Sequence, residues 1–176
     1  MNWRNTDERF GSLSIALHWS MLVLLLVVVA LMELREIFPK GSVPREAMKS
    51  LHYLLGMLVL PLTSVRMAAR LPGTVPSAPV GWQRSLAALV KFGLYALMLG
   101  MPVAGWLLLS AKGDSLAVLG WKLPPLVGPN ETLAEYMEEI HESGAALAYV
   151  LLGLHVLGAL YHHFVLRDNT LRRILP

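Results

Sequence analysis

The sequence predicts an all-α integral membrane protein folded as a four-helix bundle. Of its 176 residues, 55% are hydrophobic and only 15% are charged, whereas a water-soluble domain carries roughly 25% charged residues. Four apolar stretches are also long enough to cross a bilayer, because about 20 helical residues span its hydrocarbon core. We therefore expect a single transmembrane domain over residues 1–176, surrounded by membrane lipid.

The first helix is expected at about 13–35, where the charged residues Glu33, Arg35 and Glu36 close the apolar stretch. Its apolar part is longer than the core of a secretory signal peptide, and no Ala-x-Ala cleavage site follows it. We expect this helix to be retained in the protein.

The other helices are expected at about 47–70, 84–110 and 140–166. Charged residues follow the last of them, beginning with Arg167. Proline residues indicate two loops. They are Pro72, Pro76 and Pro79 between the second and third helices, and Pro124, Pro125 and Pro129 between the third and fourth.

The distribution of Lys and Arg predicts the orientation of the bundle, because cationic residues gather on the cytoplasmic side of membrane proteins. The side with both termini holds Arg4, Arg9, Arg66, Arg70, Arg84, Lys91, Arg167, Arg172 and Arg173. The other side holds Arg35, Lys40, Arg45, Lys49, Lys112 and Lys122, together with most acidic residues. Both termini are therefore expected in the cytoplasm.

The absence of cysteine and of nucleic-acid motifs excludes several kinds of site and partner. The chain has no cysteine, which excludes disulfides, thiolate metal sites and covalently attached haem. It also lacks motifs that read DNA or cradle nucleotide phosphates, so nucleic acid is not an expected partner.

All six histidines fall in or at the ends of the expected helices, where an ionisable side chain is costly to bury and indicates a functional site. His141 and His155 are 14 residues apart, which puts them within about 40° of one helix face and about 21 Å apart along the axis. With alternating helix directions, His18 lies at the depth of His155, and His52 at the depth of His141.

Two pairs of opposed histidines at two depths are the arrangement needed to bind two b-type haems between the helices. Small residues leave room for a porphyrin, although close helix packing explains them equally well. They are Gly56, Gly144, Ala148, Gly158 and Ala159. A zinc site is the rival, but zinc needs its ligands around one centre. Bis-histidine ligation leaves no open iron position, so electron transfer is the expected chemistry.

Two further polar residues are candidates for the inner end of the bundle. Arg66 lies 14 residues after His52, so its guanidinium could pair with a haem propionate or another anion, or extend to the interface. His162 lies seven residues beyond His155 and would suit a quinone that takes up protons as it is reduced. An aromatic belt explains most of the remaining aromatic residues, namely Trp19, Trp82, Trp106, Trp121, Tyr53, Tyr95 and Tyr161.

At this point the chain resembles the bacterial cytochrome b561 family over nearly its whole length. The matching stretches are His18-Trp19, Met32-Glu33-Leu34-Arg35, Ile37-Phe38-Pro39-Lys40-Gly41-Ser42, His52 with Gly56, Ile140-His141-Glu142, Gly153-Leu154-His155, Tyr161-His162-His163 and Asp168-Asn169-Thr170-Leu171.

The resemblance implies a bacterial inner-membrane protein with four helices and two non-covalent haem b groups. It implies axial ligands His18, His52, His141 and His155, in the pairing already inferred. A member of the family oxidises superoxide at the periplasmic face and reduces ubiquinone, and His162 matches its quinone-linked histidine. The acidic outer loops are a departure, since Arg35, Lys40, Arg45 and Lys49 would have to attract the superoxide anion locally.

Three hypotheses follow. The first is a superoxide:ubiquinone oxidoreductase with His162 as its catalytic residue. The second is an electron-conduit or anchor subunit that links a soluble redox partner, such as a dehydrogenase or hydrogenase, to the quinone pool. The third is a structural or transport bundle whose histidines bind no haem.

Overall fold

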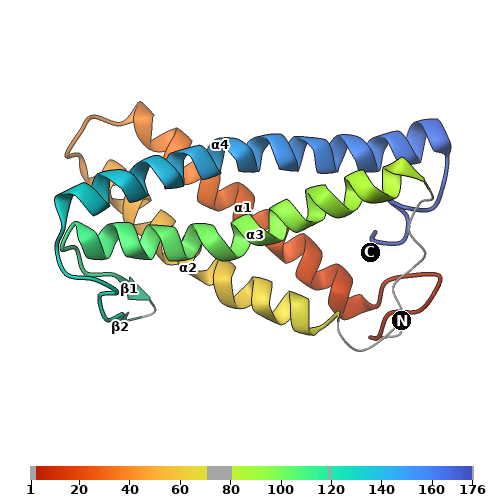
Figure 1. Cartoon of the computed structure of the whole chain (residues 1–176), viewed down its shortest axis with the longest axis horizontal. Coiled ribbons are helices and arrows are strands. Elements are labelled where there is room, and N and C mark those ends of the chain that lie inside the picture. The colour runs from red at the N-terminus through yellow and green to blue at the C-terminus, as the bar shows by residue number, and fades with distance from the viewer. Residues whose placement is uncertain (1–2, 71–80, 119, 176) are drawn as a thin grey trace.

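The computed structural model describes residues 3–70, 81–118 and 120–175, and within them it forms a bundle of four long helices (Figure 1). The predicted proline loop with Pro72, Pro76 and Pro79 lies outside the described residues. The elements in chain order are α1 (Ser12–Leu34), the 3-10 helix η1 (Arg35–Ile37), α2 (Val43–Ala68), α3 (Trp82–Ala111), β1 (Ala117–Val118), β2 (Trp121–Lys122), α4 (Glu131–Tyr161) and the π-helical turn η2 (His162–Leu166).

Successive helices run in opposite directions, so both termini lie at one end of the bundle and the β1–β2 hairpin at the other (Figure 1). Four helices in the described part are long and apolar enough to cross a membrane. Helix α4 packs most extensively against α3, and α1 against α2, while α2 also packs against α3. This is the four-helix membrane bundle that the apolar stretches predict.

The helix ends differ from the sequence prediction where a helix continues beyond the apolar span. α4 begins at Glu131 and not near residue 140, because the side chain of Asn130 accepts a hydrogen bond from the Leu133 N–H at 3.0 Å and caps the first turn. α2 begins at Val43 and not at 47, with proline in its first turn. Hydropathy detects where a helix enters lipid, whereas capping decides where the helix starts.

The C-terminal segment folds back under the start of α1. The Phe10 N–H donates to the Arg173 carbonyl at 3.3 Å, and the Trp19 indole N–H donates to the Ile174 carbonyl at 2.9 Å. Arg9 donates to the Leu175 carbonyl at 2.7 Å. These bonds tie the two chain ends together beneath the bundle, an arrangement that hydropathy does not predict.

Candidate functional site

The structure brings the intramembrane histidines together in two pairs, and each pair joins α4 to another helix. The ring centroids of His18 on α1 and His155 on α4 are 6.2 Å apart, with an interplanar angle of 70°. Those of His52 on α2 and His141 on α4 are also 6.2 Å apart, at 79°. These are the partners that the helix directions and the 14-residue spacing predict.

The spacing within each pair fits one metal ion between two imidazoles. Ring centres on opposite sides of one metal lie about 6 Å apart, given metal–nitrogen bonds of about 2.0 Å. The same pairs bridge helices whose backbones stay apart, because no Cα of α4 lies within 8 Å of a Cα in α1 or α2 among the described residues. The residues present therefore fit two flat groups held between α4 and the α1–α2 pair.

One backbone contact prepares the ring of His52 for ligation. Its Nδ1 lies 2.9 Å from the Val28 carbonyl oxygen on α1. A carbonyl can only accept, so Nδ1 carries the proton and the lone pair remains on Nε2. This tautomer is the one that binds a metal through Nε2.

The ring of His141 lies against α3, close to the Met101 backbone. Its Nδ1 is buried without a hydrogen-bond partner among the described residues. A Cβ added to Gly105 on α3 would lie 3.3 Å from the His141 Cε1 and 3.6 Å from its Nδ1. The bare backbone of Gly105 therefore forms one wall of the space that the ring occupies.

The small residues on the predicted haem faces have two different roles. A Cβ added to Gly56 or Gly158 would meet no atom within 4 Å, so these positions border open space. A Cβ added to Gly144 would lie only 2.4 Å from the Met101 sulfur. Gly144 thus lets α3 and α4 approach each other, and it does not provide the room for a cofactor that its sequence position indicates.

Arg66 lies near the His18–His155 pair, since its charge acts on both rings. Its Nε donates to the Tyr95 hydroxyl at 3.2 Å, and Arg70 donates to the same oxygen at 3.0 Å. The Arg66 Nη1 is buried and has no hydrogen-bond partner among the described residues. The Nε of the guanidinium is thus fixed by Tyr95, and Nη1 can donate to an anionic group.

The sequence places Tyr95 in an aromatic belt, and the structure adds contacts with two arginines. Tyr95 on α3 holds two arginines of the α2 end with its one hydroxyl oxygen. The signal was available in principle, because Tyr95 lies one turn beyond Lys91 on the expected third helix. Spacing within one helix does not reveal which face turns toward α2.

His162 is the first residue of the π-helical turn η2 and is buried. Its Nδ1 lies 2.5 Å from the Asp168 Oδ2, and the Asp168 Oδ1 accepts the Thr170 N–H at 2.8 Å. The described hydrogen bonds and ring contacts do not join His162 to either histidine pair. The ring of His163 contacts the Phe164 ring, with 4.8 Å between the two centroids.

Asp168 is a functional candidate that sequence reasoning did not single out. Partial burial raises the pKa of its carboxyl, but the hydrogen bonds from His162 and Thr170 outweigh this and leave that pKa below its usual value. An ionised carboxylate can only accept, so the His162 Nδ1 carries the proton and Nε2 faces away. The side chain of Asp168 is 38% exposed against 11% for His162, so it links the buried ring to solvent.

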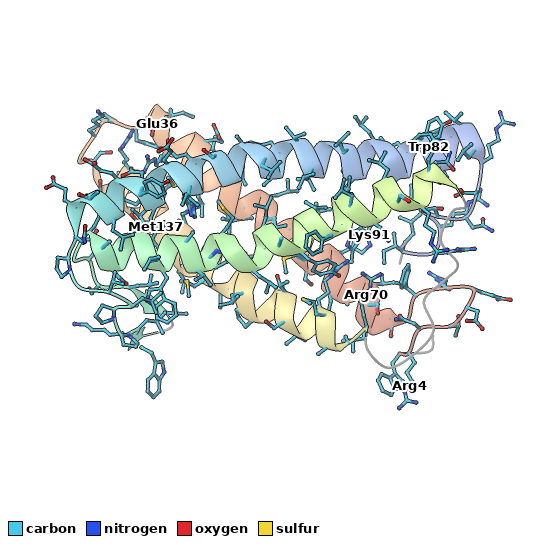
Figure 2. All side chains as sticks on the ribbon, in the orientation of Figure 1. Arg4, Glu36, Arg70, Trp82, Lys91 and Met137 are labelled. Atoms are coloured by element: carbon cyan, nitrogen blue, oxygen red, sulfur yellow. The ribbon has the colours of Figure 1, made fainter. Side chains whose placement is uncertain are left out.

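The cations at the end opposite the termini are mostly paired with glutamates. Arg45 donates to Glu36 at 2.8 Å, and Lys112 lies 2.7 Å from Glu138. Arg35 and Lys49 pair with glutamates at 3.1 Å and 3.9 Å. Figure 2 places Glu36 and Met137 at this end and Arg4, Arg70, Trp82 and Lys91 at the other.

Four membrane-spanning helices with paired histidines between them define the class of the protein as a multi-pass membrane cytochrome that binds b-type haem and takes part in electron transport. The chain belongs to the prokaryotic cytochrome b561 family, whose model matches residues 9–176.

Curated relatives extend over almost the same length. Cytochrome b561 homolog 1 of Escherichia coli K12 is 37% identical over 96% of this chain and 98% of its own. Probable superoxide oxidase CybB of Yersinia pestis is 32% identical over 96% and 97%. Cytochrome b562 of Cereibacter sphaeroides is 31% identical over 96% of both chains.

Proposed function

We propose that the protein transfers electrons across the inner membrane, from superoxide at the end opposite the termini to ubiquinone at the end that carries them. The observation that carries the proposal is the pair of histidine contacts, one toward each end of the bundle, with 6.2 Å between ring centroids in each. The likeness to a relative named as a probable superoxide oxidase supports superoxide as the donor.

His18 with His155, and His52 with His141, would each hold one non-covalent haem b. When bound, these groups supply one-electron carriers near the two faces of the membrane. The chain itself supplies the ligands, the correct tautomer at His52 and the glycine wall at His141. Arg66 would orient a propionate or another anionic group with its unpartnered Nη1.

The reaction balances with two superoxide ions for each quinone. Each superoxide gives up one electron and leaves as dioxygen, and ubiquinone takes two electrons and two protons to become ubiquinol. When both ring nitrogens of His162 carry protons, its Nε2 would donate one to the quinone and take another up from solvent, while Asp168 accepts from Nδ1 and gives the dyad access to solvent.

Stopped-flow absorbance of the purified, haem-loaded protein tests the proposal. Superoxide should reduce the haems faster than superoxide disappears by spontaneous dismutation, and added ubiquinone should then return them to the oxidised state. Superoxide dismutase, mixed in beforehand, serves as the control and should abolish the reduction. If two low-spin haems are present and superoxide leaves them oxidised, the enzymatic assignment is wrong.

A second candidate is an electron-conduit subunit for a soluble dehydrogenase or hydrogenase. It is favoured by the ion pairs of Arg35, Arg45 and Lys112, because neutralised cations steer superoxide poorly. Purification from membranes under mild detergent should then give a stoichiometric soluble partner that reduces the haems. Recovery of the cytochrome alone, with rapid superoxide oxidation, would exclude this role.

A further inference from the structure

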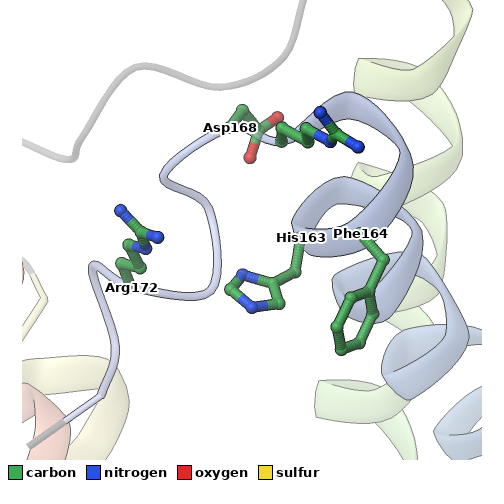
Figure 3. A pocket seen from close by; sticks show the side chains of 5 residues that line it. His163, Phe164, Asp168 and Arg172 are labelled. Atoms are coloured by element: carbon green, nitrogen blue, oxygen red, sulfur yellow. The ribbon is translucent and has the colours of Figure 1, made fainter.

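A cavity of about 330 Å³ opens where the chain leaves α4 and turns back under the bundle. It is lined by His163, Phe164, Arg167, Asp168 and Arg172. Figure 3 shows His163, Phe164, Asp168 and Arg172 around it, with Arg172 on one side of the opening and His163 and Phe164 on the other. Neither histidine pair contributes to this cavity, so it is a separate feature of the molecule.

The charge in the cavity favours an anion. The side chains of Arg167 and Arg172 form no hydrogen bond or ion pair with the described residues, and both residues are exposed. The single acidic residue, Asp168, already uses Oδ2 for His162 and Oδ1 for the Thr170 N–H. Two unpaired guanidinium groups thus face the space, and such groups bind phosphate oxygens with charge-assisted hydrogen bonds.

The backbone conformation of Arg167 also indicates a functional site. Its φ is 52°, in the left-handed region that glycine adopts without a steric penalty. An arginine at this position is unfavourable for the backbone, and such outliers indicate function when a site lies beside them. The turn carries the chain back toward α1, so that Arg172 lines the cavity with Arg167.

The position of the cavity, at the end of the last membrane span, favours a lipid as the source of the anion. The last spanning segment ends at Leu166, and the neighbouring residues Phe164 and Val165 are 68% and 62% exposed, as apolar residues facing acyl chains are. Cationic residues just beyond a spanning helix lie at the level of lipid headgroups. Phe164 lines the cavity as well, so the site has one apolar wall beside its charged one.

We propose that this cavity binds the phosphate group of an anionic phospholipid, held by Arg167 and Arg172, with an acyl chain along Phe164. A lipid phosphate group and free inorganic phosphate would bind the two arginines through the same oxygens. Only the lipid would also use the apolar wall at Phe164. The bound lipid would anchor the C-terminal turn that also carries Asp168.

Native mass spectrometry of the full-length, haem-loaded protein with added phosphatidylglycerol tests the site. The double variant Arg167→Gln/Arg172→Gln should bind the lipid at least about tenfold more weakly, because two charge-assisted contacts are lost. The matched control Arg4→Gln/Arg84→Gln removes the same charge from the same end and should stay within about twofold of the unmodified protein. An unchanged haem spectrum shows that each variant is folded.

Further variants and ligands distinguish a lipid phosphate group from free phosphate. Arg167→Lys/Arg172→Lys keeps the charge and should retain most of the binding. Phosphatidylethanolamine, which has no net charge, should bind more weakly than phosphatidylglycerol. Equal losses in the glutamine variant and its control would overturn the proposal in favour of general surface attraction. Displacement of the lipid by millimolar inorganic phosphate would overturn the lipid assignment in favour of a free-phosphate site.

Discussion

The four paired histidines act as two units, because each pair bridges α4 and one other helix. We expect His52→Ala and His141→Ala to lose the same haem, and His18→Ala and His155→Ala to lose the other, since one imidazole does not hold a low-spin iron. Haem-to-protein ratios and electron paramagnetic resonance spectra measure this.

His163→Ala is the matched control for these substitutions, because His163 contacts Phe164 and lines the cavity beyond α4, to which neither pair contributes. It should keep the full haem content. A variant set in which His52→Ala and His155→Ala shared one lost signal would contradict the pairing.

Asp168 provides a second prediction at this scale. Asp168→Asn removes the carboxylate that fixes the His162 Nδ1 proton. We expect ubiquinone to reoxidise the haems at least about tenfold more slowly, because positioned acid–base groups contribute rate factors of this size or larger. Superoxide should reduce the haems at the original rate. Stopped-flow traces separate the two half-reactions.

Asp168→Glu is the conservative control and should recover part of the reoxidation rate. If both half-reactions slow together in Asp168→Asn, the residue supports the fold and not proton delivery. Loss of neither rate would remove His162 and Asp168 from the quinone site.

Residues within one helix could be predicted from the sequence, whereas contacts across a chain reversal could not. The 14 residues between His141 and His155 set their common face by helix geometry alone. The bond from His162 to Asp168 depends instead on a π-helical turn followed by a left-handed residue. Neither conformation has a strong sequence signal, since Arg167 stands where glycine would be expected.

At the scale of elements, α3 forms a wall beside the His52–His141 pair without contributing a histidine to it. Gly105→Ala would place a Cβ 3.3 Å from the His141 Cε1, so the ring must shift by a few tenths of an ångström. We expect altered absorption and a shifted reduction potential for that haem alone, because potential depends on ligand orientation. Redox titration followed by absorbance measures both.

Gly100→Ala is the matched control on the same helix, since a Cβ there meets no atom within 4 Å. It should leave both potentials unchanged. An equal change in the two variants would mean that alanine alters α3 as a whole and that Gly105 has no special relation to His141.

The start of α4 shows why apolar patterns predict spans better than helices. The segment before residue 140 carries Glu131, Glu135, Glu138 and Glu139, so hydropathy excludes it from the membrane. It is helical nevertheless, because Asn130 caps it and its carboxylates face water and Lys112. The helix thus continues outside the apolar span, which a hydropathy window does not register.

At the scale of the whole molecule, charge is distributed unevenly between the two ends of the bundle. Arg35, Arg45, Lys49 and Lys112 pair with glutamates at the end opposite the termini. At the end with the termini, Arg84, Arg167 and Arg172 form no ion pair with the described carboxylates. An excess of Lys and Arg marks the cytoplasmic side of membrane proteins, which favours cytoplasmic termini and the proposed direction of electron flow.

The absence of cysteine makes this orientation directly testable, because a single introduced thiol is the only reactive group. Thr132→Cys lies on the exposed first turn of α4, and Glu8→Cys on the exposed N-terminal segment. In intact spheroplasts, a membrane-impermeant maleimide should label Thr132→Cys at once and Glu8→Cys only after lysis. The opposite pattern would place the His52–His141 pair toward the cytoplasm, where it could not meet periplasmic superoxide, and the proposed donor and acceptor sides would have to be exchanged.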